Sequence, residues 1–420
     1  MDTIEIFKSF SFTPRCSFDA LKMMDFIVKF ALSVGYEAKI DKANNIICRK
    51  KEPLLCLQSH YDMVCLADAP NVEIYEKDGW LMAKNSTLGA DNGIGVALML
   101  YMMSKFDDIE CLFTSDEEVG LIGANNLEHK ITSPYLLNLD SEEEGAIFIG
   151  CAGGVDITGE INTSKKPPKN DFTAYEINIK DLQGGHSGVD IDKNIPNAIK
   201  VLADELTKSE CELISIDGGE RINSIPKSAF AKVYAPSGFS VKNNDFSIQK
   251  IEQKSDILAY SDNILQMLKN FTQGVRSFDE KLKIPSKSIN LSTIKTTADK
   301  VKVEFFARAM DEKSLENLRD ETEEFLKSFG FNVKAEGFSA PWRPNITPFA
   351  RKLQSIAGRF FKNVKFKAIH AGLECGIFEN KQNSLQVASI GVNINFPHSL
   401  REKCEIASIK KLEIVLEELI

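Results

Sequence analysis

Hydrophobic and polar positions over the first 140 residues follow two different periods. Residues 18–34 carry apolar side chains at helical spacing, whereas residues 54–59 form a short and nearly continuous apolar run. The first pattern predicts an amphipathic helix, and the second predicts a strand buried on both faces. Further predicted elements are strands at 44–49, 109–115 and 134–139, a hairpin at 75–83 and an apolar helix at 93–103. This alternation of strand and helix indicates an α/β fold with a doubly wound sheet.

The pattern changes after the polar, proline-bearing stretch at residues 165–170. Alternating, half-exposed strands and several helices follow, which indicates an α+β unit. Its predicted elements are strands at 174–180, 211–216, 229–234, 288–294, 300–307 and 332–337, and helices at 196–208, 247–271 and 312–329. After Trp342-Arg343-Pro344 the chain predicts a helix at 348–361, a buried strand at 388–395 and a helix at 405–419. We therefore expect a discontinuous domain over 1–170 and 343–420, with a second domain inserted at 171–342.

The composition is that of an ordinary globular protein, with 43% hydrophobic and 26% charged residues in 420. A net charge of −9 argues against nucleic acid as a partner. The start of the chain is acidic, and the longest apolar run, at 93–103, is shorter than the ~20 residues of a membrane span, so we expect neither a secretory signal nor a membrane partner. The nine scattered cysteines predict free thiols in a reducing cytoplasm.

An acidic stretch, Thr114-Ser115-Asp116-Glu117-Glu118-Val119-Gly120, stands at the end of the strand predicted at 109–115. Adjacent carboxylates repel each other unless positive charge lies close by. A solvated acidic turn is the ordinary interpretation, and a bound cation is the alternative. The remaining strand ends favour the cation.

Three other predicted strands are also followed by side chains of the types that bind metals. Residues 54–59 lead into His60 and Asp62, residues 134–139 lead into Asp140, and residues 388–395 are followed by His398. Asp91 lies at the mouth of the apolar helix, where a helix N-cap is the ordinary interpretation. Because ligand sites in open α/β sheets form outside the carboxyl ends of the strands, we expect these side chains to meet.

Mixed imidazole and carboxylate groups suit zinc, and with lower preference cobalt or manganese. A shared Asp91 would bridge two ions, with His60 and Asp140 on one ion and Glu118 and His398 on the other. Each ion then has three protein ligands and an open position, as catalytic zinc sites do. Glu117 remains to take a proton from a water held between the ions, and Asp62 can fix the tautomer of His60.

These stretches resemble the metal motifs of the co-catalytic zinc aminoacylase and carboxypeptidase superfamily. The matching motifs lie at residues 59–64, 88–93, 114–120 and 138–140. Within that superfamily, residues 184–188, 217–223 and 370–376 are similar to the aminoacyl-histidine dipeptidases, also called peptidase D or cytosol nonspecific dipeptidases. The resemblance runs from about residue 10 to the end of the chain and is weakest between 234 and 285.

The resemblance implies that His60, Asp91, Glu118, Asp140 and His398 bind the metals. It also implies active-site roles for Asp62 and Glu117, and a zinc-binding α/β domain with an inserted lid that closes on substrate. A homodimer through the lid is compatible with it.

For the lid, the resemblance implies that His186 stabilises the tetrahedral oxyanion, from its own or a partner subunit. Asn223 and Arg308 would grip the substrate, with Arg308 on the terminal carboxylate. Glu374 would face the substrate ammonium, and His370 would line the same pocket. Tyr61 and Cys65 depart from the family pattern, which alters the pocket wall and leaves the metal ligands unchanged.

The expected activity is therefore two-metal hydrolysis of dipeptides with free termini, Xaa-His and others. An N-acyl amino acid deacylase or carboxypeptidase is the alternative within the hydrolases. A catalytically inactive binding or scaffold relative is the alternative from another class, but the presence of Glu117 together with all five proposed ligands argues against it. The sequence leaves the preferred dipeptide, the metal and the oligomeric state open.

Overall fold

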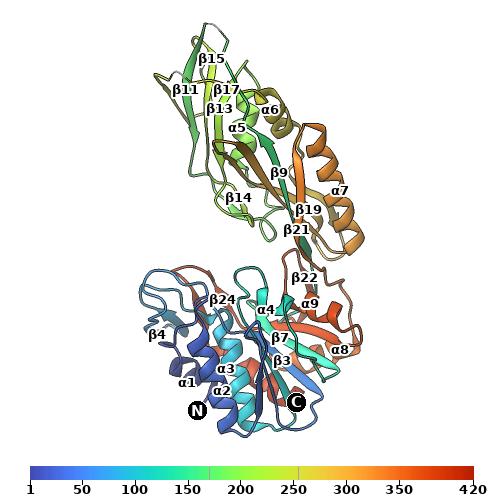
Figure 1. Ribbon diagram of the computed structural model, residues 1–420. Helices are drawn as coiled ribbons and strands as arrows, with labels where there is room; N and C mark the ends of the chain where they lie inside the picture. Colours follow the sequence, from blue (N-terminus) through green and yellow to red (C-terminus); the bar gives the residue numbers. More distant parts are fainter. Residues whose placement is uncertain (170, 254) are drawn as a thin grey trace. The chain divides into compact units, whose positions relative to one another are not determined.

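The computed structural model describes residues 1–169, 171–253 and 255–420 (Figure 1). The chain divides into two compact units. Unit 1 comprises Met1–Cys151, Trp342–Ala368 and Leu373–Ile420, and unit 2 comprises Ala152–Pro341 and Ile369–Gly372. Each unit has a hydrophobic core of its own. Among the described residues, a helix with the length and apolarity to cross a bilayer does not occur.

Unit 1 is built on a mixed sheet whose central strands are parallel, which confirms the predicted fold class. β3 lies between β6 and β7, and all of its residues are buried, which explains its nearly unbroken apolar run. The strands in spatial order are β1 (Glu37–Ile40), β2 (Ile46–Arg49), β6 (Ile109–Thr114), β3 (Leu55–His60), β7 (Tyr135–Ser141), β23 (Gln386–Gly391), β8 (Ala146–Cys151) and β22 (Lys365–Ile369).

Helices cover this sheet and close the core of unit 1. α3 packs against β3 and β7, α2 packs against β1 and β2, and α8 and α9 pack against β23. The helices are α1 (Thr3–Ser9), α2 (Leu21–Ser33), α3 (Ala90–Lys105), α4 (Ile122–Asn125), α8 (Pro348–Ala357), α9 (Glu374–Lys381) and α10 (Ile406–Leu419). A smaller sheet has the order β24 (Ile394–Asn395), β25 (Lys403–Glu405), β5 (Trp80–Ala83) and β4 (Ile74–Lys77).

Unit 2 contains a long antiparallel sheet, separate from the sheet of unit 1. Buried and partly exposed residues alternate along β9 and β20, as expected for strands that face a core on one side only. The strands in spatial order are β16 (Phe246–Lys250), β11 (Phe172–Ile179), β15 (Ala229–Pro236), β13 (Glu212–Gly218), β19 (Ile284–Thr296), β20 (Lys300–Ala309), β9 (Gly153–Asn162) and β21 (Asn332–Ser339), with β18 (Gly274–Asp279) beside β19.

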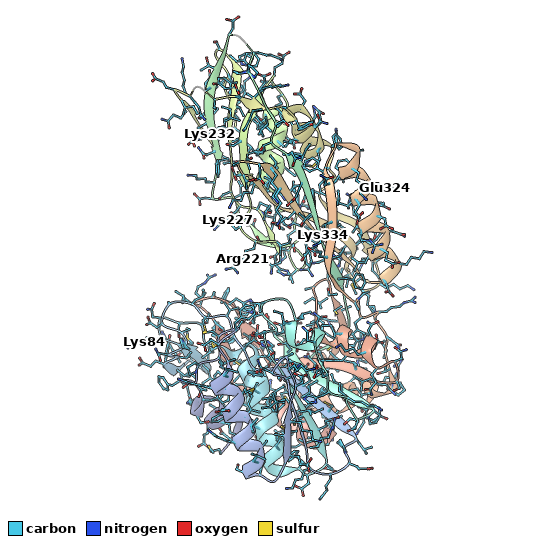
Figure 2. The ribbon with its side chains drawn as sticks, in the orientation of Figure 1. Lys84, Arg221, Lys227, Lys232, Glu324 and Lys334 are labelled. Carbon is cyan, nitrogen blue, oxygen red and sulfur yellow. A yellow bond between two sulfur atoms is a disulfide. The ribbon has the colours of Figure 1, made fainter. Side chains whose placement is uncertain are left out.

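The helices of unit 2 pack on this sheet: α5 (Ala198–Leu206) contacts β11 and β15, α6 (Ser261–Asn270) contacts β13, and α7 (Glu312–Ser328) contacts β9, β20 and β21. Two short strand pairs complete the unit. They are β10 (Lys165–Lys166) with β17 (Ile257–Leu258), and β12 (Gly185–His186) with β14 (Ser224–Ile225). Exposed charged side chains, among them Lys84 of unit 1 and Glu324 and Lys334 of unit 2, are spread over the surfaces (Figure 2).

The predicted helix over 247–271 is wrong. In its place β16 pairs with β11, β17 pairs with β10, and only α6 is helical. Lys254 and the predicted boundary residue Asn170 lie outside the described residues. Glutamine, lysine and glutamate favour a helix by intrinsic propensity, but the open edge of β11 lets Ile248 pair opposite Ile177, and this tertiary pairing overrides the local preference.

The prediction that the cysteines are free thiols is also wrong in part, because Cys16 and Cys65 form a disulfide. The other cysteines, at positions 48, 56, 111, 151, 211, 375 and 404, are buried thiols outside this disulfide. The two cysteines are 49 residues apart in the sequence. They meet because the segment before α2 lies beside the loop after β3, where the backbone of Cys16 pairs with that of Met63. No local spacing rule could have indicated this pairing.

Replacing both Cys16 and Cys65 by serine is expected to lower the free energy of unfolding by about 2–4 kcal/mol, because the disulfide restricts the unfolded chain. Urea unfolding under non-reducing conditions measures the effect. The control is the wild-type protein in excess reductant, which should match the double variant. Equal stability of the oxidised and reduced wild-type protein would contradict the expectation.

Candidate metal centre and active site

Parallel strands bring the predicted side chains to one edge of the sheet in unit 1. His60 ends β3 and pairs in register with Thr114, the last residue of β6, so Glu117 and Glu118 follow directly beside it. Asp140 lies near the end of β7, on the other side of β3. Asp91 lies at the start of α3, and His398 follows β24. Five elements of the chain therefore contribute side chains to this site.

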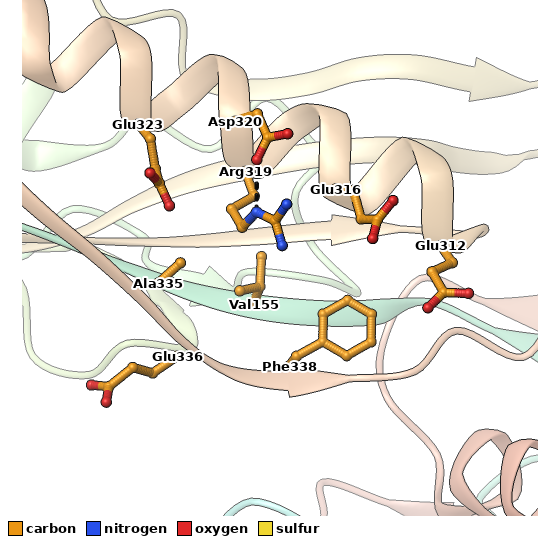
Figure 3. Close-up of a pocket in the computed structure, with 9 residues that line it drawn as sticks. All are labelled: Val155, Glu312, Glu316, Arg319, Asp320, Glu323, Ala335, Glu336 and Phe338. Atoms are coloured by element: carbon orange, nitrogen blue, oxygen red, sulfur yellow. Dashed lines mark hydrogen bonds and ion pairs between the residues drawn. The ribbon is translucent and has the colours of Figure 1, made fainter.

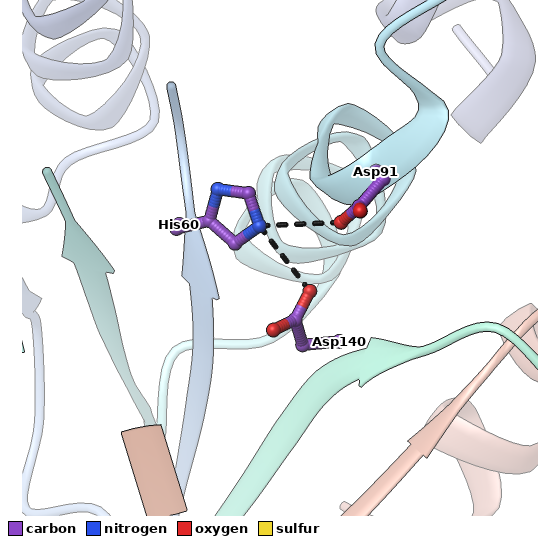
Figure 4. Close-up of side chains that lie close together, drawn as sticks. All are labelled: His60, Asp91 and Asp140. Atoms are coloured by element: carbon purple, nitrogen blue, oxygen red, sulfur yellow. Dashed lines mark hydrogen bonds and ion pairs between the residues drawn. The ribbon is translucent and has the colours of Figure 1, made fainter. Parts of the chain in front are cut away.

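The first group of side chains consists of His60, Asp91 and Asp140 (Figure 4). His60 Nε2 lies 3.2 Å from Asp91 Oδ1 and 3.3 Å from Asp140 Oδ1. His60 is buried, whereas both carboxylates are partly exposed. One imidazole nitrogen thus faces two carboxylate oxygens from two other elements.

The second group consists of Asp91, Glu118 and His398. His398 Nε2 lies 3.0 Å from Asp91 Oδ2 and 2.8 Å from Glu118 Oε1. Asp91 therefore belongs to both groups, and each of its two oxygens faces a different histidine. This is the arrangement that a carboxylate bridging two cations requires.

Asp62 is fully buried behind His60 and holds several neighbouring groups in place. Its Oδ1 lies 3.3 Å from His60 Nδ1 and accepts the backbone N–H of Glu117 at 3.0 Å, and its Oδ2 accepts the hydroxyl of Ser17 at 2.7 Å. Burial raises the pKa of Asp62, but the hydrogen bonds from His60, Ser17 and Glu117 outweigh it and lower the pKa below its usual value. The ionised carboxylate can orient the His60 ring.

Glu117 stands beside both groups, and together with His60 and Glu118 it forms a third group of side chains that could hold an ion. Its Oε2 lies 4.0 Å from His60 Nε2. Burial, together with the negative charges of Glu118, Asp140 and Glu374, raises the pKa of Glu117 well above its usual range, although His60 opposes the shift. A carboxylate with a raised pKa next to a metal centre is suited to accepting a proton.

The two histidines interact favourably with the negative charges of the neighbouring carboxylates. Burial would lower the pKa of His398, but hydrogen bonds to Asp91 and Glu118 raise it to about 11. Burial raises the pKa of Asp140 to about 6, against the effect of His60. Since a metal ion requires neutral imidazole and ionised carboxylate, divalent cations would displace these protons and neutralise the same charges. The nitrogen and oxygen donors fit zinc.

Glu374, at the start of α9, is fully buried in unit 1. Its Oε2 accepts hydrogen bonds from Gln58 Nε2 at 2.5 Å and Thr114 Oγ1 at 2.8 Å. Burial raises its pKa to about 7, and the negative charge of Asp140 adds to the shift against the effect of His60. Its role towards a substrate ammonium stays a prediction.

The remaining predicted residues lie in unit 2 and meet around Gly188. A Cβ added to Gly188 would lie 3.1 Å from Arg308 Nε, 3.2 Å from His186 Cε1 and 2.3 Å from the carbonyl oxygen of His370. The backbone N–H of Ser187 donates to the carbonyl of Asn223 at 2.9 Å. These predicted residues therefore form a second cluster, which leaves no room for a side chain at position 188.

The imidazole of His370 is uncharged at neutral pH within this second cluster. Its Nε2 lies 2.7 Å from the hydroxyl oxygen of Ser288. Burial lowers the pKa of His370 to about 3, and the positive charges of Arg308 and His186 lower it further. The guanidinium of Arg308 thus gives this cluster a fixed positive charge, which suits an anionic ligand.

Three residues that the sequence did not indicate contact the proposed metal ligands or the loop of Asp91. Asn92 Nδ2 donates to Asp140 Oδ1 at 2.7 Å, Arg15 Nη2 donates to the carbonyl of Gly89 at 2.5 Å, and Glu402 accepts backbone N–H groups of the Asp91 loop. Burial lowers the pKa of Arg15 to about 10, so it stays a cation at neutral pH. Asn92 could have been found from its place beside Asp91, but Arg15 and Glu402 carry no local signal.

A groove in unit 2 lies between α7 and β21 (Figure 3). Acidic side chains of Glu312, Glu316 and Glu323 line it, and Arg319 donates to Asp320 at 2.8 Å. The predicted site residues, all of which the structure describes, are not part of its lining. The groove is therefore separate from both clusters.

Comparison with known proteins relates the chain to a group of peptidases. The family model described as peptidase family M20/M25/M40 matches residues 56–420. The matched region contains His60, Asp91, Glu118, Asp140 and His398.

The chain is also similar to individual peptidases over nearly its whole length. The cytosol non-specific dipeptidase of Escherichia coli (strain K12) is 29% identical over 467 residues, which cover 99% of this chain and 96% of that protein. The crystal structure of aminoacylhistidine dipeptidase from Vibrio alginolyticus has a TM-score of 0.80 at 25% identity and covers 99% of this chain and 96% of that one. A tripeptidase from Staphylococcus aureus shares the fold, with a TM-score of 0.61 at 17% identity over 100% of this chain and 96% of that one.

Proposed function

Because the chain belongs to peptidase family M20/M25/M40 and is a metallopeptidase, we propose that it hydrolyses dipeptides with free termini, including Xaa-His dipeptides. The observation that carries the proposal is the position of Asp91, whose two carboxylate oxygens each face a different histidine. The names of the two full-length relatives support the choice of dipeptides as substrates.

Two divalent cations, zinc by preference and cobalt or manganese as substitutes, would polarise the scissile carbonyl and lower the pKa of water. His60 and Asp140 would hold one ion, Glu118 and His398 would hold the other, and Asp91 would bind both. The donor types and the two groups of three side chains fit this assignment.

Glu117 takes the proton of the attacking water and then delivers it to the amine that leaves as the peptide bond breaks. Its raised pKa and its place beside His60 support this role. Asp62 Oδ1 lies 3.3 Å from His60 Nδ1, where it would accept the Nδ1 proton and so keep Nε2 directed at Asp91 and Asp140.

Unit 2 serves as the substrate-closing lid in this proposal. His186 would stabilise the tetrahedral oxyanion, and Asn223 and Arg308 would grip the substrate, with the planar guanidinium of Arg308 on its carboxylate. His370 would line the same pocket. Their meeting around Gly188 supports a common role. Glu374 of unit 1 would face the substrate ammonium. A cytoplasmic location and a homodimer through unit 2 belong to the same proposal.

A substrate panel tests the function. Wild-type protein loaded with Zn²⁺, Mn²⁺ or Co²⁺ is assayed on Xaa-His and other dipeptides, tripeptides, and N-acetyl and N-succinyl amino acids. Dipeptides are expected to exceed the N-acyl compounds in kcat/KM by about 100-fold or more, because an acyl group removes the charged amino terminus that a polar site would bind.

The control for this panel is the Glu117→Gln protein purified in the same way, which excludes a contaminating peptidase. Faster hydrolysis of N-acyl amino acids would assign the chain to the deacylases. Metal binding without hydrolysis of any compound would favour an inactive relative.

A further inference from the structure

Glu402 holds the loop that carries Asp91. Its Oε2 accepts the backbone N–H groups of Leu88 at 2.8 Å and Gly89 at 2.9 Å, and its Oε1 accepts those of Ala90 at 2.8 Å and Asp91 at 3.3 Å. The side chain is only 3% exposed. One buried carboxylate therefore satisfies four successive N–H groups, which is far more than an ordinary surface glutamate does.

These N–H groups belong to the start of α3. The residue before this helix, Gly89, has φ 65° and no side chain to cap it, so the N-terminal N–H groups need an acceptor from elsewhere. Glu402 supplies one from a position more than 300 residues away in the sequence, and its negative charge is favourable at a helix N-terminus.

Arg15 also holds this loop, but it binds a backbone carbonyl group instead of the N–H groups. Its Nη2 donates to the carbonyl of Gly89 at 2.5 Å, and a Cβ on Gly89 would lie 2.3 Å from that nitrogen. The peptide groups on both sides of Gly89 are thus fixed, one through its N–H by Glu402 and the other through its C=O by Arg15. This leaves the backbone of the loop little freedom to move away from the metal-binding residues.

The segment that contains Glu402 also carries a proposed ligand. His398 lies four residues before it, and the backbone N–H of Glu402 donates to the carbonyl of Ser399 at 3.1 Å. The short stretch 398–402 therefore places the His398 ring against Asp91 Oδ2 and at the same time clamps the backbone of Asp91.

We propose that Glu402 is a positioning residue for the metal centre: its carboxylate fixes the loop at 88–91 so that the two oxygens of Asp91 are directed at the two metal positions. The inference rests on the proposed function, since it assumes that Asp91 bridges two cations. It predicts that Glu402 controls metal affinity without contacting a metal itself.

The variant Glu402→Gln tests this role. The carboxamide keeps the size of the side chain but has one acceptor oxygen and one donor NH₂ group, so two of the four N–H groups lose their acceptor. In the metal-free protein we expect amide hydrogen exchange at 88–91 to become roughly ten- to hundredfold faster. In a Zn²⁺ titration against a chromophoric chelator we expect roughly 10–100-fold weaker binding of both ions.

Glu110→Gln is the matched control. Glu110 is also fully buried in unit 1, where its carboxylate accepts the backbone N–H groups of Thr132 and Ser133 at 3.1 Å each. It is not among the metal-binding residues, so its loss is expected to reduce stability while zinc affinity stays within about threefold of wild type. If Glu402→Gln does not fold, Glu402→Asp replaces it and should show a smaller loss in the same direction.

Wild-type zinc affinity in a folded Glu402→Gln protein, or unchanged exchange at 88–91, would overturn the proposal. An equal loss of zinc affinity in Glu110→Gln would do so as well, because the effect would then be general destabilisation. A wild-type protein that binds no divalent cation would instead overturn the proposed function, and hydrogen exchange alone would then show whether Glu402 holds the loop.

Discussion

Replacing Glu117 by glutamine is expected to lower kcat by about 10²–10⁴-fold, the usual contribution of a general base, while both ions stay bound. Glu117 lies 4.0 Å from His60 Nε2, outside the shorter contacts that join Asp91 to the two histidines. Its carboxylate is therefore available for proton transfer. Steady-state kinetics on a cleaved dipeptide, together with metal analysis of the same sample, measures both parts.

The adjacent glutamate is the control for this expectation. Glu118 lies 2.8 Å from His398 Nε2, so Glu118→Gln should lose metal as well as activity. The two variants remove the same chemical group at neighbouring positions and differ only in the predicted role. Ordinary turnover in Glu117→Gln, or loss of metal from it, would remove Glu117 from the role of base.

Replacing Asp91 by alanine is expected to release both ions, and this is the second large effect. Each oxygen of Asp91 faces a different histidine, so its removal takes one of three protein ligands from each ion. Affinity for each ion should fall by at least about 100-fold, since the loss of groups that only support ligands already costs 10–100-fold. Metal-to-protein ratios after gel filtration, and titration with zinc, measure the loss.

Asp107→Ala serves as the control for Asp91. Asp107 follows the other end of α3 and forms ion pairs with Lys50 and Lys51 at the surface, so its loss should leave both ions in place. Retention of one ion at full affinity in Asp91→Ala would show that Asp91 is a ligand of the other ion alone. The bridging role would then be withdrawn.

Much of this centre could be predicted from the sequence because strand ends are visible in it. His60, Glu118 and Asp140 each follow a short apolar run, and the carboxyl ends of parallel strands meet at one edge of a sheet. The structure brings these side chains together with Asp91 and His398. Their roles as ligands stay predictions that the metal measurements above address.

Other features could not be predicted because local pattern does not decide them. The pattern over 247–271 predicts one helix, yet residues 246–250 form a strand because the edge of β11 is available for pairing. Cys16 and Cys65 bond because two loops pack side by side, and their separation in the sequence gives no indication of it.

The sequence by itself determined the α/β character of unit 1, the acidic and histidine residues at its strand ends and the chemistry that those groups can perform, because period and residue type are local properties. Only the tertiary structure decided that Asp91 faces both histidines, that Glu402 and Arg15 hold its loop, and that burial and neighbouring charges shift the pKa of Glu117. Distances between residues remote in the sequence depend on how the whole chain packs, and electrostatic effects depend on those distances.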